Sequence, residues 1–193
     1  MCEVGAGMSM AAEQLLRNGR SLDRLMITDQ SARMIQYSLP FREKGAMLAV
    51  ADAEKLPFKD DQFDCLVSSV GDPYNKPDFW REVARVLKPQ GSVLFTVPAY
   101  AWAECFRKEV GGASYAKAEF ELLDGRRVLL PSYIYPEAMQ EGMIQKSGMI
   151  VIERRRVTIG DIRDDNLSPK LCVNRGAEGE IVTGYLICKR SKK

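Results

Sequence analysis

Short apolar runs alternate with longer amphipathic stretches through the first half of this chain, and this alternation limits the possible folds more than any other feature. Strands of a parallel sheet read as short apolar runs, and the helices between them carry one apolar face. The pattern therefore predicts βα units around a parallel sheet. We expect strands at residues 1–4, 25–29, 47–50, 64–67 and 92–97, and helices at 9–18, 31–39 and 78–87.

The second half of the sequence predicts a different arrangement. Asp124-Gly125 is a favourable tight-turn dipeptide between two apolar runs, so we expect a hairpin with strands at 120–123 and 128–130. The last two strands have no helix between them and should lie antiparallel. The other expected elements are a helix at 101–110 with a Gly111-Gly112 break after it, a helix at 136–146, strands at 149–157 and 181–189, and a polar, turn-rich segment at 159–179.

Composition limits the chemistry and the surroundings of the chain. Among 193 residues there is no histidine, which removes the commonest general base and most catalytic zinc sites, so no metal site is predicted. The five cysteines are widely spaced and form no Cys-x-x-Cys, which favours reduced thiols and a cytoplasmic location. No apolar run reaches the roughly 20 residues of a membrane span. A net charge of +2 neither favours nor excludes nucleic acid.

The first expected strand, Cys2-Glu3-Val4, ends in the turn Gly5-Ala6-Gly7. Glycines at the start of a helix let a ligand approach the backbone without meeting a Cβ. Asp29 ends the next strand, where nucleotide-binding α/β units carry a ribose-binding carboxylate. Met10 stands where a dinucleotide motif would have its third glycine, which argues against NAD and for a ligand without a pyrophosphate, such as S-adenosylmethionine (SAM).

Four sequence features follow successive predicted strands, and the carboxyl ends of parallel strands form the ligand-binding edge of an open α/β sheet. These features are the glycine turn, Asp29, the segment 52–58 beginning Asp52-Ala53, and the segment 63–69 containing Ser68. We therefore expect them to converge on one site.

With these segments, the chain resembles the class I SAM-dependent methyltransferases, in particular the superfamily of ubiquinone and menaquinone biosynthesis methyltransferases. The resemblance covers about residues 1–98. Residues 79–91 are similar to the family's segment of helix, R-x-L-K-P-G-G and strand, with Gln90 in place of the first glycine. The resemblance implies a Rossmann-like, doubly wound α/β fold: a mostly parallel seven-stranded sheet with one antiparallel strand and helices on both faces.

The resemblance also implies which residues bind SAM. Asp29, with Gln30 beside it, would accept the ribose hydroxyls, and Asp52 would accept the adenine amino group. The implied cofactor-binding set is Glu3 at the amino-acid end, the backbone of Gly5, Ala6 and Gly7 against the methionine and ribose, Asp29, Gln30, Asp52, the Ala53 amide at a ring nitrogen, and the Ser68 backbone at the methionine ammonium.

The acceptor side of the site is less well defined by the sequence. Asp72-Pro73-Tyr74 is similar to the motif that amine-directed methyltransferases carry after this strand, but it has one proline and stands a few residues late. Asp72 and Tyr74 are the candidate catalytic residues, and a rigid turn is the alternative. The family builds its substrate lid in the variable second half, which here contains four further aromatic candidates: Tyr100, Trp102, Tyr133 and Tyr135.

These observations predict a single domain, with residues 1–98 binding cofactor and 99–193 facing the substrate, the latter with an insertion at 99–135. A small-molecule acceptor is expected, while a protein or nucleic-acid acceptor stays open. Family members usually carry helices before the first strand, whereas Met1 already lies in the strand here. This predicts that the lid is truncated or comes from the insertion, an oligomer or a partner chain.

Three alternatives remain at this stage. The first is a methyltransferase-like binding or assembly module without activity. The second is a nicotinamide-dependent oxidoreductase, which Met10 and the lack of an evident Tyr-x-x-x-Lys pair argue against. The third concerns Arg154, Arg155 and Arg156, which resemble a nucleic-acid patch. Alternate side chains of a strand diverge, so a solvated sheet edge is the favoured interpretation.

Overall fold

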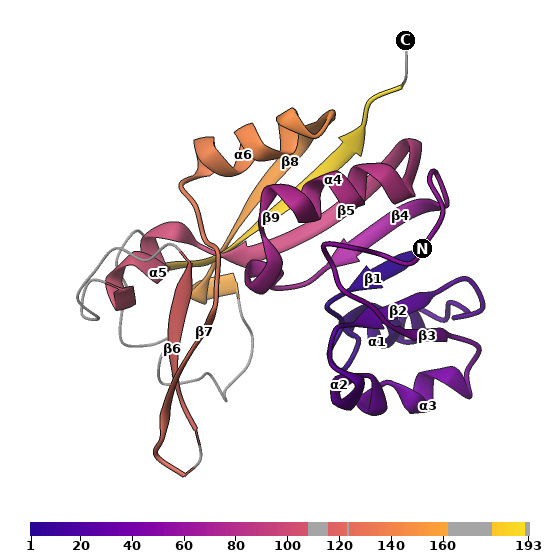
Figure 1. Cartoon of the computed structure of the whole chain (residues 1–193), viewed down its shortest axis with the longest axis horizontal. Helices are drawn as coiled ribbons and strands as arrows, with labels where there is room; N and C mark the ends of the chain where they lie inside the picture. Colours follow the sequence, from indigo (N-terminus) through magenta and orange to yellow (C-terminus); the bar gives the residue numbers. More distant parts are fainter. Residues whose placement is uncertain (108–115, 123, 162–178, 192–193) are drawn as a thin grey trace.

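A seven-stranded sheet forms the centre of the computed structural model, which describes residues 1–107, 116–122, 124–161 and 179–191 (Figure 1). The strand order is β3-β2-β1-β4-β5-β9-β8, and β9 runs antiparallel to both of its neighbours. The predicted fold class is confirmed. The strands are β1 (Cys2–Val4), β2 (Met26–Asp29), β3 (Met47–Val50), β4 (Phe63–Ser68), β5 (Leu87–Pro98), β8 (Met149–Thr158) and β9 (Glu180–Lys189).

The helices start and stop close to the positions that the sequence signals predict. Ser9 and Ser31 accept hydrogen bonds from the amides of Ala12 and Met34 and thereby cap the first two helices. The helix predicted at 31–39 ends at Tyr37, and a second short helix with Pro40 in its first turn begins at Leu39. The helices are α1 (Met10–Arg17), α2 (Ala32–Tyr37), α3 (Leu39–Arg42), η1 (Asp72–Tyr74), α4 (Pro77–Val86), α5 (Tyr100–Arg107), α6 (Glu137–Lys146) and η3 (Ile159–Asp161).

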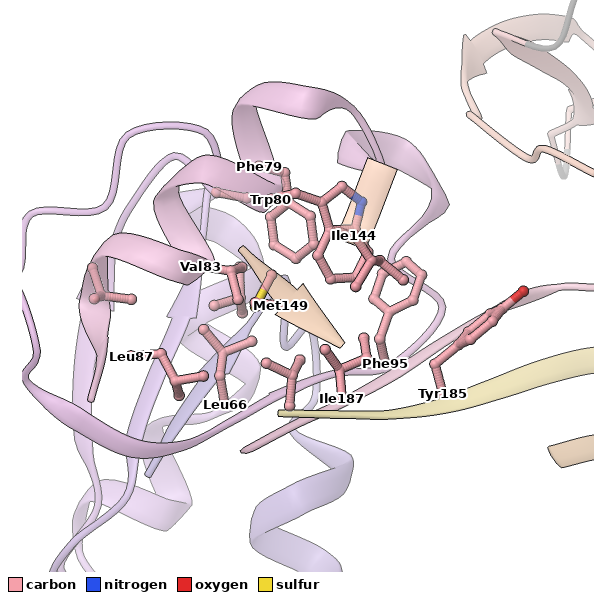
Figure 2. Packing of buried hydrophobic residues seen from close by; sticks show 14 of the residues in the cluster. Leu66, Phe79, Trp80, Val83, Leu87, Phe95, Ile144, Met149, Tyr185 and Ile187 are labelled. Carbon is pink, nitrogen blue, oxygen red and sulfur yellow. The ribbon is translucent and has the colours of Figure 1, made fainter. Parts of the chain in front are cut away.

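The core lies mainly between the sheet and the helices α4 and α6 (Figure 2). Phe79, Trp80 and Val83 of α4 are fully buried there. The Trp80 ring lies 4.9 Å from the ring of Phe95 on β5, in an edge-on arrangement that aromatic pairs favour. A second, smaller cluster includes Ala12 of α1 and Ile27 of β2. The sheet is thus held rigid beneath the strand ends that concern the site.

Strand β5 begins at Leu87, five residues before the predicted start at residue 92. Phe63 pairs with Leu87 and Cys65 with Ser92, so the residues between Leu87 and Ser92 bulge out of the ladder. Gln90 in this bulge has φ +63°. A positive φ favours glycine, which explains why the related motif has glycine at this position.

Replacing Gln90 by glycine is therefore expected to stabilise the protein by up to about 1 kcal/mol, because left-handed strain is removed at a smaller cost in chain entropy. Urea unfolding measures this change. Gln145→Gly is the matched control: Gln145 lies in α6, where glycine is expected to cost about 1 kcal/mol. Equal losses in the two variants would contradict the strain argument.

The hairpin predicted in the second half is present as β6 (Lys117–Glu121) and β7 (Arg127–Pro131), a separate two-stranded sheet that projects from the body (Figure 1). Helix α5 begins one residue before its predicted start. The end of that predicted helix, the Gly111-Gly112 break, Leu123 and residues 162–178 lie outside the described part of the chain.

The three consecutive arginines lie on β8, at an edge of the sheet. Arg154 forms ion pairs with Glu137 and Glu141 of α6, at 2.9 and 2.8 Å. Arg156 forms ion pairs with Glu137 and with Glu180 of β9. These acidic partners offset the positive charge, so the structure favours the solvated edge over a nucleic-acid patch.

None of the helices in the described ranges is long and apolar enough to cross a membrane. The same part of the chain holds no group of three or more His, Cys, Asp or Glu side chains arranged to bind a metal ion.

Candidate functional site

The segments singled out in the sequence meet at one edge of the sheet. Strands β3, β2, β1 and β4 are neighbours and run parallel, so their carboxyl ends lie side by side. The glycine turn follows β1, and Asp29 ends β2. Asp52 comes two residues after β3, and Ser68 ends β4. The expectation that these segments converge follows directly from the strand order.

Asp29 connects the glycine turn to helix α2. One carboxylate oxygen accepts the Gly7 amide at 2.9 Å, and the other accepts the Ser31 amide at 2.8 Å. A carboxylate has about four acceptor sites, so two contacts leave capacity for further donors. Asp29 is half-buried. This geometry fits an acid that is fixed in place and still able to bind a pair of ligand hydroxyls.

Backbone groups of the glycine turn form hydrogen bonds with other parts of the protein. The Ala6 amide donates to the Thr28 carbonyl at 2.9 Å, and the Gly7 carbonyl accepts the Ser38 hydroxyl at 3.0 Å. Gly5 and Gly7 have φ of +64° and +53°, a conformation that glycine adopts without strain. The turn is therefore formed before any ligand binds.

Glu3 is buried beneath the turn, with 1% of its surface exposed. Its carboxylate accepts the Ser9 hydroxyl and the Ala11 amide, the latter at 3.0 Å. Glu3 thus stabilises the positive end of α1, and any influence on a ligand passes through the turn. Burial raises the pKa of Glu3, and the contacts with Ser9 and Ala11 oppose that shift.

This raised pKa predicts a pH effect on stability. Because the pKa of Glu3 is higher in the folded than in the unfolded chain, the folded state holds the proton more tightly. Its stability contribution is fully present below the ordinary value of 4.5 and falls as the pH rises through the folded pKa. Unfolding free energies from pH 4 to 8 should therefore decline for wild type relative to Glu3→Gln. Parallel profiles would contradict this assignment.

The remaining predicted cofactor residues occupy different environments. Asp52 is exposed and accepts the Glu54 amide at 2.9 Å, while Ala53 is buried in the main core cluster. Gln30 is exposed beside Asp29. Ser68 is fully buried, and its hydroxyl lies 2.9 Å from that of Tyr74. Their contacts with a cofactor stay predictions.

Tyr74 fills space that we expected to admit a ligand. A Cβ placed on Gly5 would lie 2.6 Å from the ring atoms Cε1 and Cζ of Tyr74, and closer still to its hydroxyl. The expectation that this side of Gly5 is open is therefore wrong, because a protein ring occupies it. Burial raises the pKa of Tyr74 above its usual range, and nearby Asp29 adds to the effect. The phenol stays protonated at neutral pH and acts as a donor.

Asp72 holds the loop after β4 against the second half of the chain. It is buried and accepts the Ser132 hydroxyl at 2.6 Å, while its backbone carbonyl accepts the Tyr133 amide at 2.7 Å. These contacts favour positioning over proton abstraction for Asp72, and its catalytic role stays a prediction. Lys76 pairs with Glu54 at 2.6 Å and lies over the Tyr133 ring.

The other aromatic residues of the second half differ in burial. Tyr100 and Trp102 pack partly buried against the main core cluster. Burial raises the pKa of Tyr135, which is half-buried two residues after Tyr133. Tyr133 and Tyr135 thus remain the candidates for a wall on the acceptor side.

One polar residue of this region, Asn75, carries no signal in the sequence. Its amide donates to the Tyr133 carbonyl at 2.9 Å and to the side-chain oxygen of Gln140 at 2.6 Å. Its oxygen accepts from the Trp80 indole at 2.9 Å and from Gln140 at 3.1 Å. Gln140 is 65 positions away in the chain, so no local pattern could have revealed this network.

Comparison with known proteins identifies the fold and its family. The model of the methyltransferase domain family matches residues 2–95, which include the glycine turn, Asp29, Asp52 and Ser68. This part of the chain is a class I SAM-dependent methyltransferase domain. Such a domain implies SAM as its cofactor. The half-buried carboxylate of Asp29 and the preformed glycine turn fit that group.

Curated relatives of the methyltransferase domain match over part of the chain. The mitochondrial arginine-hydroxylase NDUFAF5 of Danio rerio is 34% identical over 91 residues, which are 46% of this chain and 27% of that protein. The ubiquinone/menaquinone biosynthesis C-methyltransferase UbiE of Pseudomonas aeruginosa (strain LESB58) is 31% identical over 99 residues, which are 48% of this chain and 39% of that protein. The chain thus spans less than half the length of either relative.

Solved structures match the methyltransferase domain and the second half together. A SAM-dependent methyltransferase from Methanosarcina mazei gives a TM-score of 0.74 at 15% identity, covering 99% of this chain and 92% of that one. A complex between the Haloferax volcanii Trm112 methyltransferase activator and a methyltransferase gives 0.73 at 17% identity, covering 100% and 82%. At these identities the likeness concerns the fold alone.

Proposed function

We propose that this chain transfers a methyl group from SAM to a small-molecule acceptor by in-line displacement. The observation that carries the proposal is Asp29, whose carboxylate stands at the ligand-binding edge beside a preformed glycine turn. Asp29 would hold the two ribose hydroxyls in charge-assisted hydrogen bonds. Asp52 and the Ala53 amide would bind adenine, with Gln30 near the ribose.

The amino-acid end of the cofactor would lie over Gly5, Ala6 and Gly7 toward Ser68, with Glu3 supporting the turn from below. When bound, SAM supplies a methyl group on a sulfonium that needs no further activation. The protein's task is then to hold the acceptor in line, about 3 Å from the methyl group, and to exclude water.

The acceptor would lie beyond β4, near Asp72, Tyr74 and Tyr133. In this proposal Asp72 positions the acceptor side through Ser132, and Tyr74 stays a neutral phenol whose hydroxyl donates to the Val4 carbonyl. Residues 1–98 serve the cofactor and residues 99–193, with the insertion 99–135, serve the acceptor. We place the reaction in the cytoplasm, since the described cysteines Cys2, Cys65 and Cys188 are free thiols.

A second candidate function is a binding or assembly module whose lid comes from a partner chain. Met8, two residues before α1, and Met10, its first residue, are 62% and 59% exposed next to the glycine turn. Exposed apolar side chains at a binding edge favour a cover. The complex of the Haloferax volcanii methyltransferase with an activator is a precedent for such a partner.

One experiment separates these functions. The purified chain is incubated with SAM labelled in the methyl group and with a cell extract that has been separated into small metabolites, protein and nucleic acid. Label entering one fraction identifies the acceptor class, and Asp29→Ala should abolish it. SAM binding without transfer into any fraction would favour the assembly module. Failure to bind SAM would contradict the proposal.

A further inference from the structure

Tyr74 is seated between two glycines that belong to different loops. Gly5 follows β1, and its missing side chain gives room to the Tyr74 ring. Gly71 follows β4, and a Cβ there would lie 2.5 Å from both Phe95 Cε2 and Ser68 Oγ and 3.2 Å from Tyr74 Cε2. Real Cβ atoms do not tolerate such distances to rigid neighbours. The Tyr74 ring thus excludes a side chain at Gly5, while at Gly71 Phe95 and Ser68 exclude one and Tyr74 adds a tight contact.

The Tyr74 hydroxyl joins the two strands at the point where their pairing stops. Backbone pairing of β1 and β4 covers Cys2 with Leu66 and Glu3 with Val67. One residue further along each strand, the hydroxyl donates to the Val4 carbonyl at 2.8 Å. Its only proton is used there, so the Ser68 hydroxyl donates to Tyr74 at 2.9 Å. The phenol therefore adds one more rung to the ladder.

This hydrogen bond lies on the β4 side of the ligand-binding edge, away from the two acids. In the strand order β3-β2-β1-β4, Asp29 ends β2 and Asp52 follows β3, while the Tyr74 hydroxyl contacts the ends of β1 and β4. The ring also packs against Phe79 of the core, at 5.0 Å between centroids. The ring is therefore supported by the core, and Tyr74 as a whole is half-exposed.

We infer that Tyr74 is a positioning residue that forms the floor of the crevice between β1 and β4 and fixes the seat of the cofactor's amino-acid tail. The inference rests on the proposed function, because it assumes that SAM binds at this edge. Tyr74 should therefore affect the Kd of ligands that carry the amino-acid tail, and should not affect the binding of the nucleoside end by Asp29.

Tyr74→Phe tests this inference because it keeps the ring and removes both hydrogen bonds of the hydroxyl. Calorimetry is performed with SAM, with its demethylated product S-adenosylhomocysteine, and with 5′-methylthioadenosine, which lacks the amino-acid part. If the loss of positioning costs about as much as one hydrogen bond, the Kd for the first two ligands should rise roughly tenfold. The Kd for 5′-methylthioadenosine should stay within about twofold.

Two further variants make the test robust. Ser68→Ala removes one of the two hydrogen bonds and should weaken the tail-bearing ligands in the same direction by a smaller factor, even if Tyr74→Phe folds poorly. Tyr37→Phe is the matched control, since Tyr37 lies 53% exposed on α2, and it should change no Kd.

The outcomes distinguish failure of the inference from failure of the function. Equal weakening of all three ligands, or no change in any of them, overturns the positioning role while leaving SAM binding in place. A wild-type chain that binds none of the three overturns the proposed function and this inference together.

Discussion

Replacing Asp29 by alanine is expected to weaken SAM binding by about 100-fold or more. The carboxylate would form two charge-assisted hydrogen bonds with the ribose, and their loss amounts to about 3 kcal/mol. The same change frees the Gly7 and Ser31 amides, which both donate to this side chain. The turn would then lose its connection to α2. Isothermal titration with SAM and S-adenosylhomocysteine measures the effect.

Asp64→Ala provides the matched control. Asp64 is an exposed acid near the start of β4, at the opposite edge of the sheet, where it pairs with Lys88 at 2.8 Å. Its removal should leave the Kd for SAM unchanged. Asp29→Asn keeps one acceptor oxygen and should fall between wild type and Asp29→Ala. A Kd for Asp29→Ala within threefold of wild type, in a protein that still unfolds cooperatively, would mean that the ribose lies elsewhere.

The sequence was sufficient to predict the sheet and the edge that carries the site. Strand periodicity is local, and parallel strands joined by helices bring their carboxyl ends together whatever the other contacts are. For this reason Gly5, Asp29, Asp52 and Ser68 could be assigned to one edge before their neighbours were known. The reversed strand β9 was predictable as well, because no helix separates the last two strands.

Other parts of the site depend on contacts that local patterns do not encode. Gly5 had the signature of a ligand-binding glycine, yet the space beside it is filled by Tyr74 from a loop about 70 residues later. Position 90 shows the opposite case: the family motif has glycine there and this chain has Gln90, yet Gln90 adopts the same positive φ at an energetic cost. In each case a tertiary contact or a backbone angle decided the outcome.

The polar network around Asn75 is the feature that sequence patterns were least able to reveal, and it predicts the largest loss of stability. Asn75→Leu should lower the free energy of unfolding by about 4 kcal/mol, because the Trp80 indole, the Gln140 amide and the Tyr133 carbonyl each lose a buried partner at about 1–3 kcal/mol. Chemical unfolding followed by tryptophan fluorescence measures the loss.

A double variant shows whether the loss comes from unpaired groups or from altered packing. Gln140→Leu added to Asn75→Leu removes one of the stranded groups, so the pair should lose clearly less than the sum of the single variants. Gln145→Leu, at an exposed position of the same helix, should change stability by about 0.5 kcal/mol or less. Strict additivity would instead point to packing. Asn75 also donates to the Tyr133 carbonyl. A non-additive loss in the double variant would therefore mean that the buried amides of Asn75 and Gln140 fix both the core and the position of Tyr133 on the acceptor side.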